Sequence, residues 1–296
     1  GHYIKDIGRG KDGARALGRA QAADLMGQVL DQQVSDLELG AFCIAMRIKG
    51  ETAEEMAGFL DATQARLNPV RLGGTPTVVL PSYNGARKLP VLTPLLALLL
   101  AREGVAVAMH GTATEDKRVS SQAVLAALGI TASDASPRVK AGDVVFVPTG
   151  VLNPGLERLL AVRRVVGLRN PGHSLVKLMN PGDGPALVVG SYTHPEYLQS
   201  MSATFALTGQ HALLLRGTEG ECVADARRTP AMDVFKNGET LRVQEPQEGS
   251  LAKMPELPGT DATATAAYIQ QVLQGTLPVP APIALQVQHI LREVKP

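Results

Sequence analysis

The residues best suited to chemistry lie in loops that follow apolar, β-branched runs. The loop Pro81-Ser-Tyr-Asn-Gly-Ala-Arg-Lys88 follows the run at 77–80 and precedes an apolar helical pattern that begins near Thr93. A strand, a short loop and a helix often form an anion site, because the helix N-terminus presents free N–H groups and a positive dipole end. This loop has one glycine, so it would hold phosphate through Arg87 and Lys88 and not through a cradle of backbone amides.

A second loop has the same position relative to its strand. His110-Gly-Thr-Ala-Thr-Glu-Asp-Lys-Arg118 follows the apolar run 105–109, and Ser120 starts the next helical pattern. Lys117 and Arg118 could hold phosphate at that helix start, or the segment is a solvated loop with a serine cap. Ligands of open α/β sheets bind beyond the carboxyl ends of the strands, so both loops are expected to share one rim. We expect His110 to order its loop and not to act as a general base.

A third basic segment, residues 167–181, carries Arg169, His173 and Lys177 at intervals of four residues. In a helix these three side chains share one face, where they repel one another unless they meet an anion or a carboxylate. A Pro-Gly pair lies between Arg169 and His173, so Arg169 is expected to precede the helix. The alternative is a solvated basic face.

The composition restricts how such residues could bind a partner. Aromatic residues make up only 3% of the 296 residues and Trp is absent, which argues against the aromatic stacking platform of single-strand-binding proteins. The net charge is +1, but basic residues predominate between 138 and 177 and in the first twenty residues, which include Arg9 and Lys11. Acidic residues predominate between 219 and 261. Segregated charge can form a basic groove or solvated helix faces.

The cysteines and the hydropathy indicate a compartment. Cys43 and Cys222 lack metal-ligand spacing, so we expect buried free thiols in a reducing, cytoplasmic environment. The longest apolar stretch, 91–101, is interrupted by Thr93 and Pro94 and is too short to cross a membrane. No signal peptide is recognisable, and no membrane partner is expected. The first residue is Gly1 and not Met, which suggests that the N-terminus has been trimmed.

These loops need a framework of alternating strands and helices. Up to residue 67 the patterns are helical only, at 36–49 and at 53–67, where Thr52 and Glu55 form a capping box. Strand patterns follow at 77–80, 105–109, 143–147, 186–190 and 211–216, between helix patterns at 93–103, 121–128, 154–162, 173–179, 194–208, 262–274 and 282–294. Continuous apolar strands between helices are typical of a mainly parallel sheet covered on both faces, and 223–257 should extend it at one edge.

The sequence therefore predicts an α/β fold with an added helical domain. The small all-helical N-terminal domain spans 1–67 and is joined by helices from about 154–182. The large α/β domain, with a mainly parallel central sheet, spans 74–153 and 183–296.

The order of segments resembles anthranilate phosphoribosyltransferase over nearly the whole chain. The matching segments are Asp36-Leu-Glu-Leu-Gly40, Ala45-Met-Arg-Ile-Lys-Gly50, Gly104-Val-Ala-Val-Ala-Met-His-Gly111, Val124-Leu-Ala-Ala-Leu-Gly-Ile130, Gly167-Leu-Arg169, Asn180-Pro181, His194-Pro-Glu196 and Arg216-Gly-Thr-Glu-Gly220. The resemblance implies a homodimer formed through the small helical domain. It also implies one more C-terminal helix than this chain carries.

The departures from those enzymes bear on activity. The family's Gly-Thr-Gly-Gly-Asp loop, which holds phosphoribosyl pyrophosphate, is replaced here by Pro81-Ser-Tyr-Asn-Gly85. The family's Asp-Glu pair, which holds magnesium, aligns with Glu221-Cys222, and a thiol is a poor ligand for a hard cation. Glu219 lies near enough to offer a shifted metal site, or the segment is a solvated acidic loop. Without the usual metal, neutralising a pyrophosphate leaving group is difficult, so we expect no catalytic residues, metal or cofactor.

The basic residues are kept where the glycines are lost. Met109 replaces the family's Lys before His-Gly, Arg118 matches a lysine of the following loop, and Arg169 matches an arginine that contacts the aromatic acceptor. This pattern is similar to the YbiB-like branch, in which motifs such as Pro-Ser-Tyr-Asn-Gly-Ala-Arg-Lys and Ile-Gly-Arg-Gly-Lys recur. That resemblance implies a homodimer that binds DNA and RNA along basic grooves with little sequence preference.

We therefore expect a protein that binds single- or double-stranded nucleic acid through its phosphates. The candidate residues are Arg9, Lys11, Tyr83, Asn84, Arg87, Lys88, Lys117, Arg118, Arg169, His173 and Lys177. Tyr83 either stacks on a base or sugar or packs within its loop. One alternative is a transferase that uses phosphoribosyl pyrophosphate with an atypical substrate loop. Another is a scaffold whose basic face binds an acidic protein.

Overall fold

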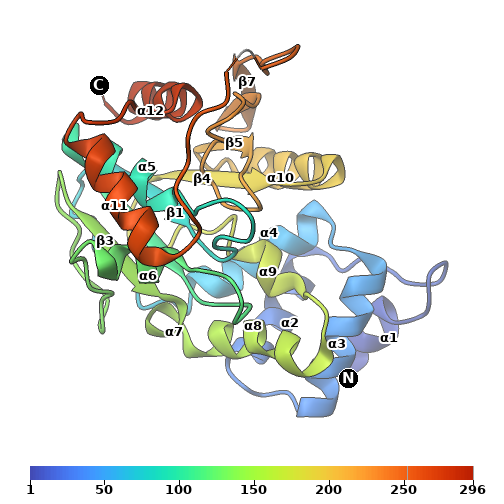
Figure 1. Cartoon of the computed structure of the whole chain (residues 1–296). Helices are drawn as coiled ribbons and strands as arrows, with labels where there is room; N and C mark the ends of the chain where they lie inside the picture. Colours follow the sequence, from blue (N-terminus) through green and yellow to red (C-terminus); the bar gives the residue numbers. More distant parts are fainter. Residues whose placement is uncertain (252, 296) are drawn as a thin grey trace.

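Amphipathic helices at the start of the chain form a small lobe, shown in blue in Figure 1. The computed structural model describes residues 1–251 and 253–295. The helices of this segment are α1 (His2–Ile7), α2 (Arg19–Leu30), α3 (Asp36–Lys49) and α4 (Ala53–Gln64). The predicted capping box starts α4, with the N–H of Glu55 donating to Thr52 Oγ1 at 3.1 Å.

Close helix contacts in this lobe depend on glycine. A Cβ atom at Gly58 of α4 would lie 2.2 Å from the carbonyl oxygen of Arg19 at the start of α2. A Cβ atom at Gly155, in α8 (Pro154–Val166), would lie 2.1 Å from the carbonyl oxygen of Leu30. A larger residue at either position would push the helices apart. Helix α8 therefore packs against the N-terminal helices, although it is far from them in sequence.

The large lobe is built on a seven-stranded sheet in the order β3-β2-β1-β4-β5-β6-β7. The strands are β1 (Thr77–Pro81), β2 (Ala106–Gly111), β3 (Val144–Pro148), β4 (Leu187–Tyr192), β5 (Ala212–Arg216), β6 (Met232–Lys236) and β7 (Glu239–Gln244). In this order, neighbouring strands from β3 through β5 are parallel. At the other edge of the sheet, β6 is antiparallel to both β5 and β7. The predicted fold class and the edge extension are both confirmed.

Buried side chains cover both faces of the sheet. Along β1, Val79 faces the core shared with the helical lobe, whereas Val78 and Leu80 face a second core on the opposite side. The remaining helices are α5 (Thr93–Arg102), α6 (Ser121–Ala127), α7 (Thr149–Leu152), α9 (Pro171–Leu175), α10 (Pro195–Thr208), α11 (Ala262–Leu273) and α12 (Ala281–Val294). Burial on both faces explains why the strands are continuously apolar.

Both cysteines and the apolar segments agree with what their sequence contexts predict. Cys43 and Cys222 are buried and unpaired, as expected. Among the described residues, no helix has both the length and the apolar character needed to cross a bilayer.

Candidate functional site

The two basic loops lie side by side at the carboxyl end of the sheet. Strands β1 and β2 are parallel neighbours, so the loops that follow them leave the same edge. The N–H of Ala86 in the first loop donates to the carbonyl oxygen of Val119 in the second at 2.8 Å. The expected shared rim is therefore present.

The first loop is held by a buried carboxylate that follows β5, two strands away from β1 in the sheet. Glu221 is 2% exposed, and its Oε1 accepts hydrogen bonds from Ser82 Oγ at 2.5 Å and Thr93 Oγ1 at 2.7 Å. Its Oε2 accepts from the N–H groups of Asn84 at 2.9 Å and Gly85 at 3.1 Å. The backbone donors that could meet a phosphate therefore already bind a carboxylate of the protein itself.

A second carboxylate holds the end of the same loop. The carboxylate of Glu219 accepts from the N–H of Lys88 at 3.0 Å and from the N–H of Leu89 at 2.6 Å. Sequence reasoning missed this contact, because it considered Glu219 only as part of a shifted metal site or of a solvated acidic loop. Both acids follow β5, which ends at the same edge of the sheet as β1, and this position is the signal that could have revealed the contact.

The magnesium ion implied by the resemblance does not fit these residues. A carboxylate has about four lone-pair positions, and four donors already engage the two oxygens of Glu221. The neighbouring thiol of Cys222 is buried, which raises its pKa and keeps it protonated. Within residues 1–251 and 253–295, no group of three or more His, Cys, Asp or Glu side chains is placed to hold a metal ion.

Tyr83 packs inside the rim. Its side chain is 6% exposed, and its hydroxyl shares hydrogen bonds with His110 Nδ1 at 2.6 Å and Thr149 Oγ1 at 2.9 Å. Burial lowers the pKa of His110 to about 3, so the imidazole is neutral. Of the two roles considered for Tyr83, the structure shows packing within the loop, and the contact agrees with an ordering role for His110.

The third basic segment is less helical than predicted. Helix α9 ends at Leu175, and the next turns tighten: the N–H of Lys177 donates to Ser174 O at 3.2 Å, and that of Leu178 to Leu175 O at 3.0 Å. These i→i−3 bonds are typical of a 3₁₀ turn, which places side chains differently from an α-helix. The predicted helix 173–179 is therefore wrong in extent.

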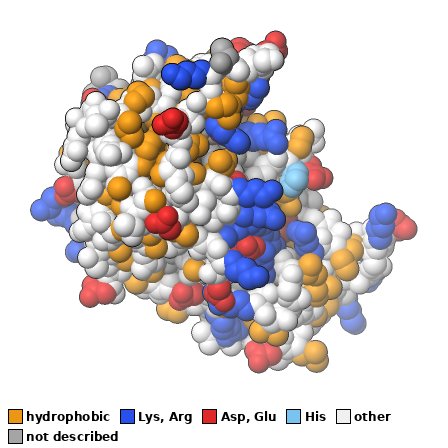
Figure 2. Space-filling view, in the orientation of Figure 1, with side chains coloured by type: hydrophobic (Ala, Val, Ile, Leu, Met, Phe, Trp, Pro, Cys, Tyr) orange, Lys and Arg blue, Asp and Glu red, His pale blue; other side chains and the backbone are white. Residues whose placement is uncertain are grey.

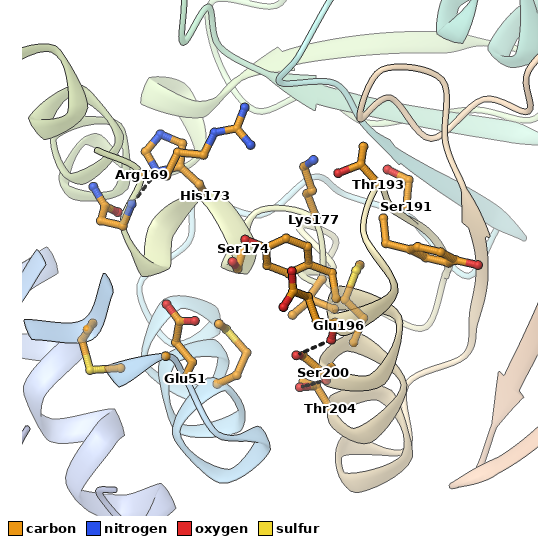
Figure 3. A pocket seen from close by; sticks show the side chains of 18 of the residues that line it. Glu51, Arg169, His173, Ser174, Lys177, Ser191, Thr193, Glu196, Ser200 and Thr204 are labelled. Carbon is orange, nitrogen blue, oxygen red and sulfur yellow. Dashed lines mark hydrogen bonds between the residues drawn. The ribbon is translucent and has the colours of Figure 1, made fainter. Parts of the chain in front are cut away.

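A cavity of about 460 Å³ lies between the two lobes and collects the residues of this segment (Figure 3). Arg169, His173 and Lys177 form part of its wall. The turn between α3 and α4 and the start of α10 form the other walls. Further lining residues are Glu51, Met56, Tyr83, Asn84, Ser200 and Met201.

The basic side chains of the cavity carry little compensating charge. The ammonium of Lys177 donates to Gly220 O at 3.2 Å. Its pKa is lowered to about 8, first by burial and second by the positive charge of Arg169. Burial and the nearby Arg163 and Arg118 lower the pKa of Arg169. No described residue accepts a hydrogen bond from the Arg169 guanidinium. These cations raise one another's electrostatic energy, so an anion would stabilise them.

Arg118 differs, because acids of its own loop neutralise it. Glu115 pairs with Arg118 at 2.7 Å and with Arg163 of α8 at 2.5 Å, and Asp116 pairs with Arg164 at 3.0 Å. These contacts attach the second loop to α8. Arg163 was absent from the predicted site because its proximity to the loop depends on the packing of α8. We use the name basic cleft for the cavity together with Arg118 and Arg163.

The other predicted residues lie outside the cavity. Arg87, Lys88 and Lys117 are exposed on the rim loops. Arg9 and Lys11 are exposed between α1 and α2, where Arg9 Nε donates to Lys5 O at 3.0 Å. Figure 2 shows Lys and Arg side chains gathered in a band near the centre of the view, over the junction of the lobes. Of the predicted residues, the cavity brings together Tyr83, Asn84, Arg169, His173 and Lys177.

Comparisons with known proteins agree with this architecture. Residues 2–66 match the model of the glycosyl transferase family, helical bundle domain. The YbiB protein of Escherichia coli K12 is 39% identical over 292 residues, which cover 96% of this chain and 90% of that protein. Anthranilate phosphoribosyltransferase of Anaeromyxobacter sp. strain Fw109-5 is 30% identical over 278 residues, with 91% and 82% covered.

Solved structures show the same fold. The anthranilate phosphoribosyltransferase TrpD of Thermus thermophilus superposes with a TM-score of 0.78 at 23% identity, covering 99% of this chain and 89% of that one. The Saccharomyces cerevisiae enzyme in complex with PRPP and Mg has a TM-score of 0.68 at 15% identity, with 97% and 84% covered.

Proposed function

Because the chain belongs to the anthranilate phosphoribosyltransferase-like superfamily and is similar to YbiB, we propose that it binds single- or double-stranded DNA or RNA without sequence preference in its basic cleft. The observation that carries this proposal is the pair Arg169, which is exposed, and Lys177, which is half-buried; both cations line one cavity without a carboxylate partner among the described residues. Phosphates of a nucleic acid would supply the missing negative charge.

A polymer fits the distribution of charge better than one small phosphate does. Arg169 and Lys177 lie in the cavity, whereas Arg87, Lys88 and Lys117 lie exposed on the rim loops. Separate cations can each meet a different phosphate of a strand. Such contacts position a backbone but do not read bases, and the low aromatic content offers few stacking partners.

Transfer of a phosphoribosyl group is the alternative, with Arg87, Lys88 and Arg118 on the pyrophosphate. The carboxylates of Glu219 and Glu221 argue against it, because they occupy the N–H groups of the substrate loop. Calorimetry with phosphoribosyl pyrophosphate and Mg²⁺ tests this alternative, and tight, magnesium-dependent binding would favour it. An acidic protein partner remains the third reading, and it would compete with an oligonucleotide for the cleft only if both use the same cations.

The test of the proposed function is the salt dependence of binding. We expect Arg169→Ala to weaken binding of a single-stranded oligonucleotide several-fold, because one phosphate contact is lost. The slope of log K against log salt should become shallower by about one unit. Fluorescence anisotropy across a salt series measures both quantities.

Two matched variants accompany this test. Arg102→Ala removes an exposed arginine at the end of α5, which is at the opposite edge of the sheet, and should leave binding unchanged. Glu115→Gln frees Arg118 and Arg163 from their shared carboxylate and should tighten binding. Wild-type binding that barely changes with salt would contradict the proposal. An unchanged slope for Arg169→Ala alone would place the phosphates elsewhere.

We also propose that a second copy of the chain covers an apolar stripe on α3. Leu37, Ile44 and Ile48 are 85%, 36% and 65% exposed, and their spacing places them on one face of the helix. The double variant Leu37→Glu with Ile48→Glu should convert a dimer into a monomer, because charges cannot be buried there without partners. Light scattering after size exclusion measures the mass. Leu207→Glu, on α10 of the other lobe, is the control, and a monomeric wild-type protein would refute the proposal.

A further inference from the structure

Three hydrogen-bond donors at one end of the cavity lack acceptors. The N–H of Asn170 donates to His173 Nδ1 at 3.1 Å, and the pKa of His173 is lowered to about 4, first by burial. The neutral ring must then carry its hydrogen on Nε2, which is buried without a partner in the described structure. Arg169 and two of the three N–H groups of Lys177 are also free to donate. Of these donors only His173 Nε2 is buried, whereas Arg169 is exposed and Lys177 is half-buried on the same cavity wall. Two cations without carboxylate partners on one wall indicate a site for an anion with several oxygens.

The other side of the cavity has a different character. Figure 3 shows Glu51 on the side of the helical lobe, away from Arg169 and Lys177. Burial raises the pKa of the Glu51 carboxyl, and the apolar side chains of Met56 and Met201 line the same cavity. An acceptor beside apolar walls suits a flat ring with an N–H edge, such as a nucleobase.

We propose that the cavity takes one nucleotide that carries a phosphate monoester, as the terminal unit of a bound strand. The inference rests on the proposed function and concerns the same site. A monoester carries nearly two negative charges and three acceptor oxygens, whereas an internal diester has one charge and two free oxygens. The monoester therefore matches Arg169 and Lys177 in charge, and its three oxygens can accept from the guanidinium and the ammonium. The base then lies toward Glu51, Met56 and Met201.

The test compares oligothymidylates of about ten nucleotides that differ only in a terminal phosphate or hydroxyl, a length near the site size of single-strand-binding folds. Both 5′- and 3′-phosphorylated forms are measured, at raised salt to screen the diester contacts. We expect one phosphorylated form to bind about tenfold more tightly than the hydroxyl form. Ser200→Trp places a large ring in the cavity from an exposed position on α10. It should remove this preference, so that the phosphorylated and hydroxyl forms bind the variant with equal affinity.

The outcomes separate this inference from the proposed function. Equal, salt-dependent binding of all oligonucleotides would overturn the inference and keep nucleic-acid binding. A preference that persists in Ser200→Trp would also overturn it, because the phosphate would then be recognised outside the cavity. If no oligonucleotide binds, the proposed function fails. Calorimetry with thymidine 5′-monophosphate then tests whether the cavity binds a nucleotide on its own. Binding that Ser200→Trp abolishes supports a nucleotide site, and no binding refutes it.

Discussion

Replacing Glu221 with alanine is expected to lower the free energy of unfolding by about 4 kcal/mol, since four buried or partly buried donors lose their acceptor at once. For a chain of this size the melting temperature should fall by about 6 °C. Ser82, Thr93 and the N–H groups of Asn84 and Gly85 cannot all turn to water, because the rim is closed over them. Thermal unfolding followed by circular dichroism measures the shift.

Two further variants show whether the effect belongs to the carboxylate. Glu221→Gln keeps the shape but replaces one acceptor oxygen by a donor, so we expect roughly half the loss. Glu239→Ala removes an exposed acid on β7 and should change stability by less than about 0.5 kcal/mol. A Glu221→Ala protein as stable as the wild type would show that this carboxylate does not hold the loop.

The role of Glu221 also explains why the first loop has its composition. A glycine-rich loop leaves its N–H groups free for a ligand, whereas here the carboxylates of Glu221 and Glu219 accept hydrogen bonds from those groups. The loop is thereby fixed in one conformation without a ligand. Arg87 and Lys88 remain exposed, so the charge of the loop is directed to solvent and to any partner that passes over the rim.

The fold was predictable because its signals are local. Apolar runs marked β1 to β5, and the Thr52–Glu55 capping box marked the start of α4. The order of the strands was not predictable in the same way: β4 lies next to β1, and only tertiary packing decides this. The prediction of the extent of α9 was wrong for a related reason, because the tighter turns after the helix leave no distinct signal in the spacing of residues.

The site was predictable only in part. Arg169, His173 and Lys177 were found through their spacing, although only His173 lies in α9, and Arg169 and Lys177 flank this short helix on the wall of one cavity. The bond between Glu221 and Asn84 joins residues 137 positions apart, and no local pattern reports such a contact. Glu115 likewise meets Arg163 only after α8 has packed. The positions of the charged residues were therefore visible in the sequence, whereas the ion pairs and hydrogen bonds that neutralise them were not.

Lys177 makes the binding of nucleic acid dependent on pH in a defined direction. In the free protein its pKa is lowered to about 8, so the ammonium loses its proton between pH 7 and pH 9.5. A phosphate beside the ammonium stabilises the charged form, so the pKa in the complex is higher than in the free protein. Affinity is then constant below pH 8 and falls above it, because binding at high pH must take up a proton. We expect about a tenfold loss between pH 7 and pH 9.5.

Fluorescence anisotropy at constant ionic strength measures this profile, with Lys177→Arg as the control. The guanidinium keeps its charge throughout this range, so the variant should show a flat profile. The charged and titratable groups near Lys177 are Arg169, Arg118, Glu221 and Cys222. Burial, the largest effect, raises the pKa of the Cys222 thiol well above its usual value, and His173 titrates near 4, so neither ionises in this window. A wild-type profile as flat as that of Lys177→Arg would show that no phosphate meets Lys177, and the anion would then depend on Arg169 without it.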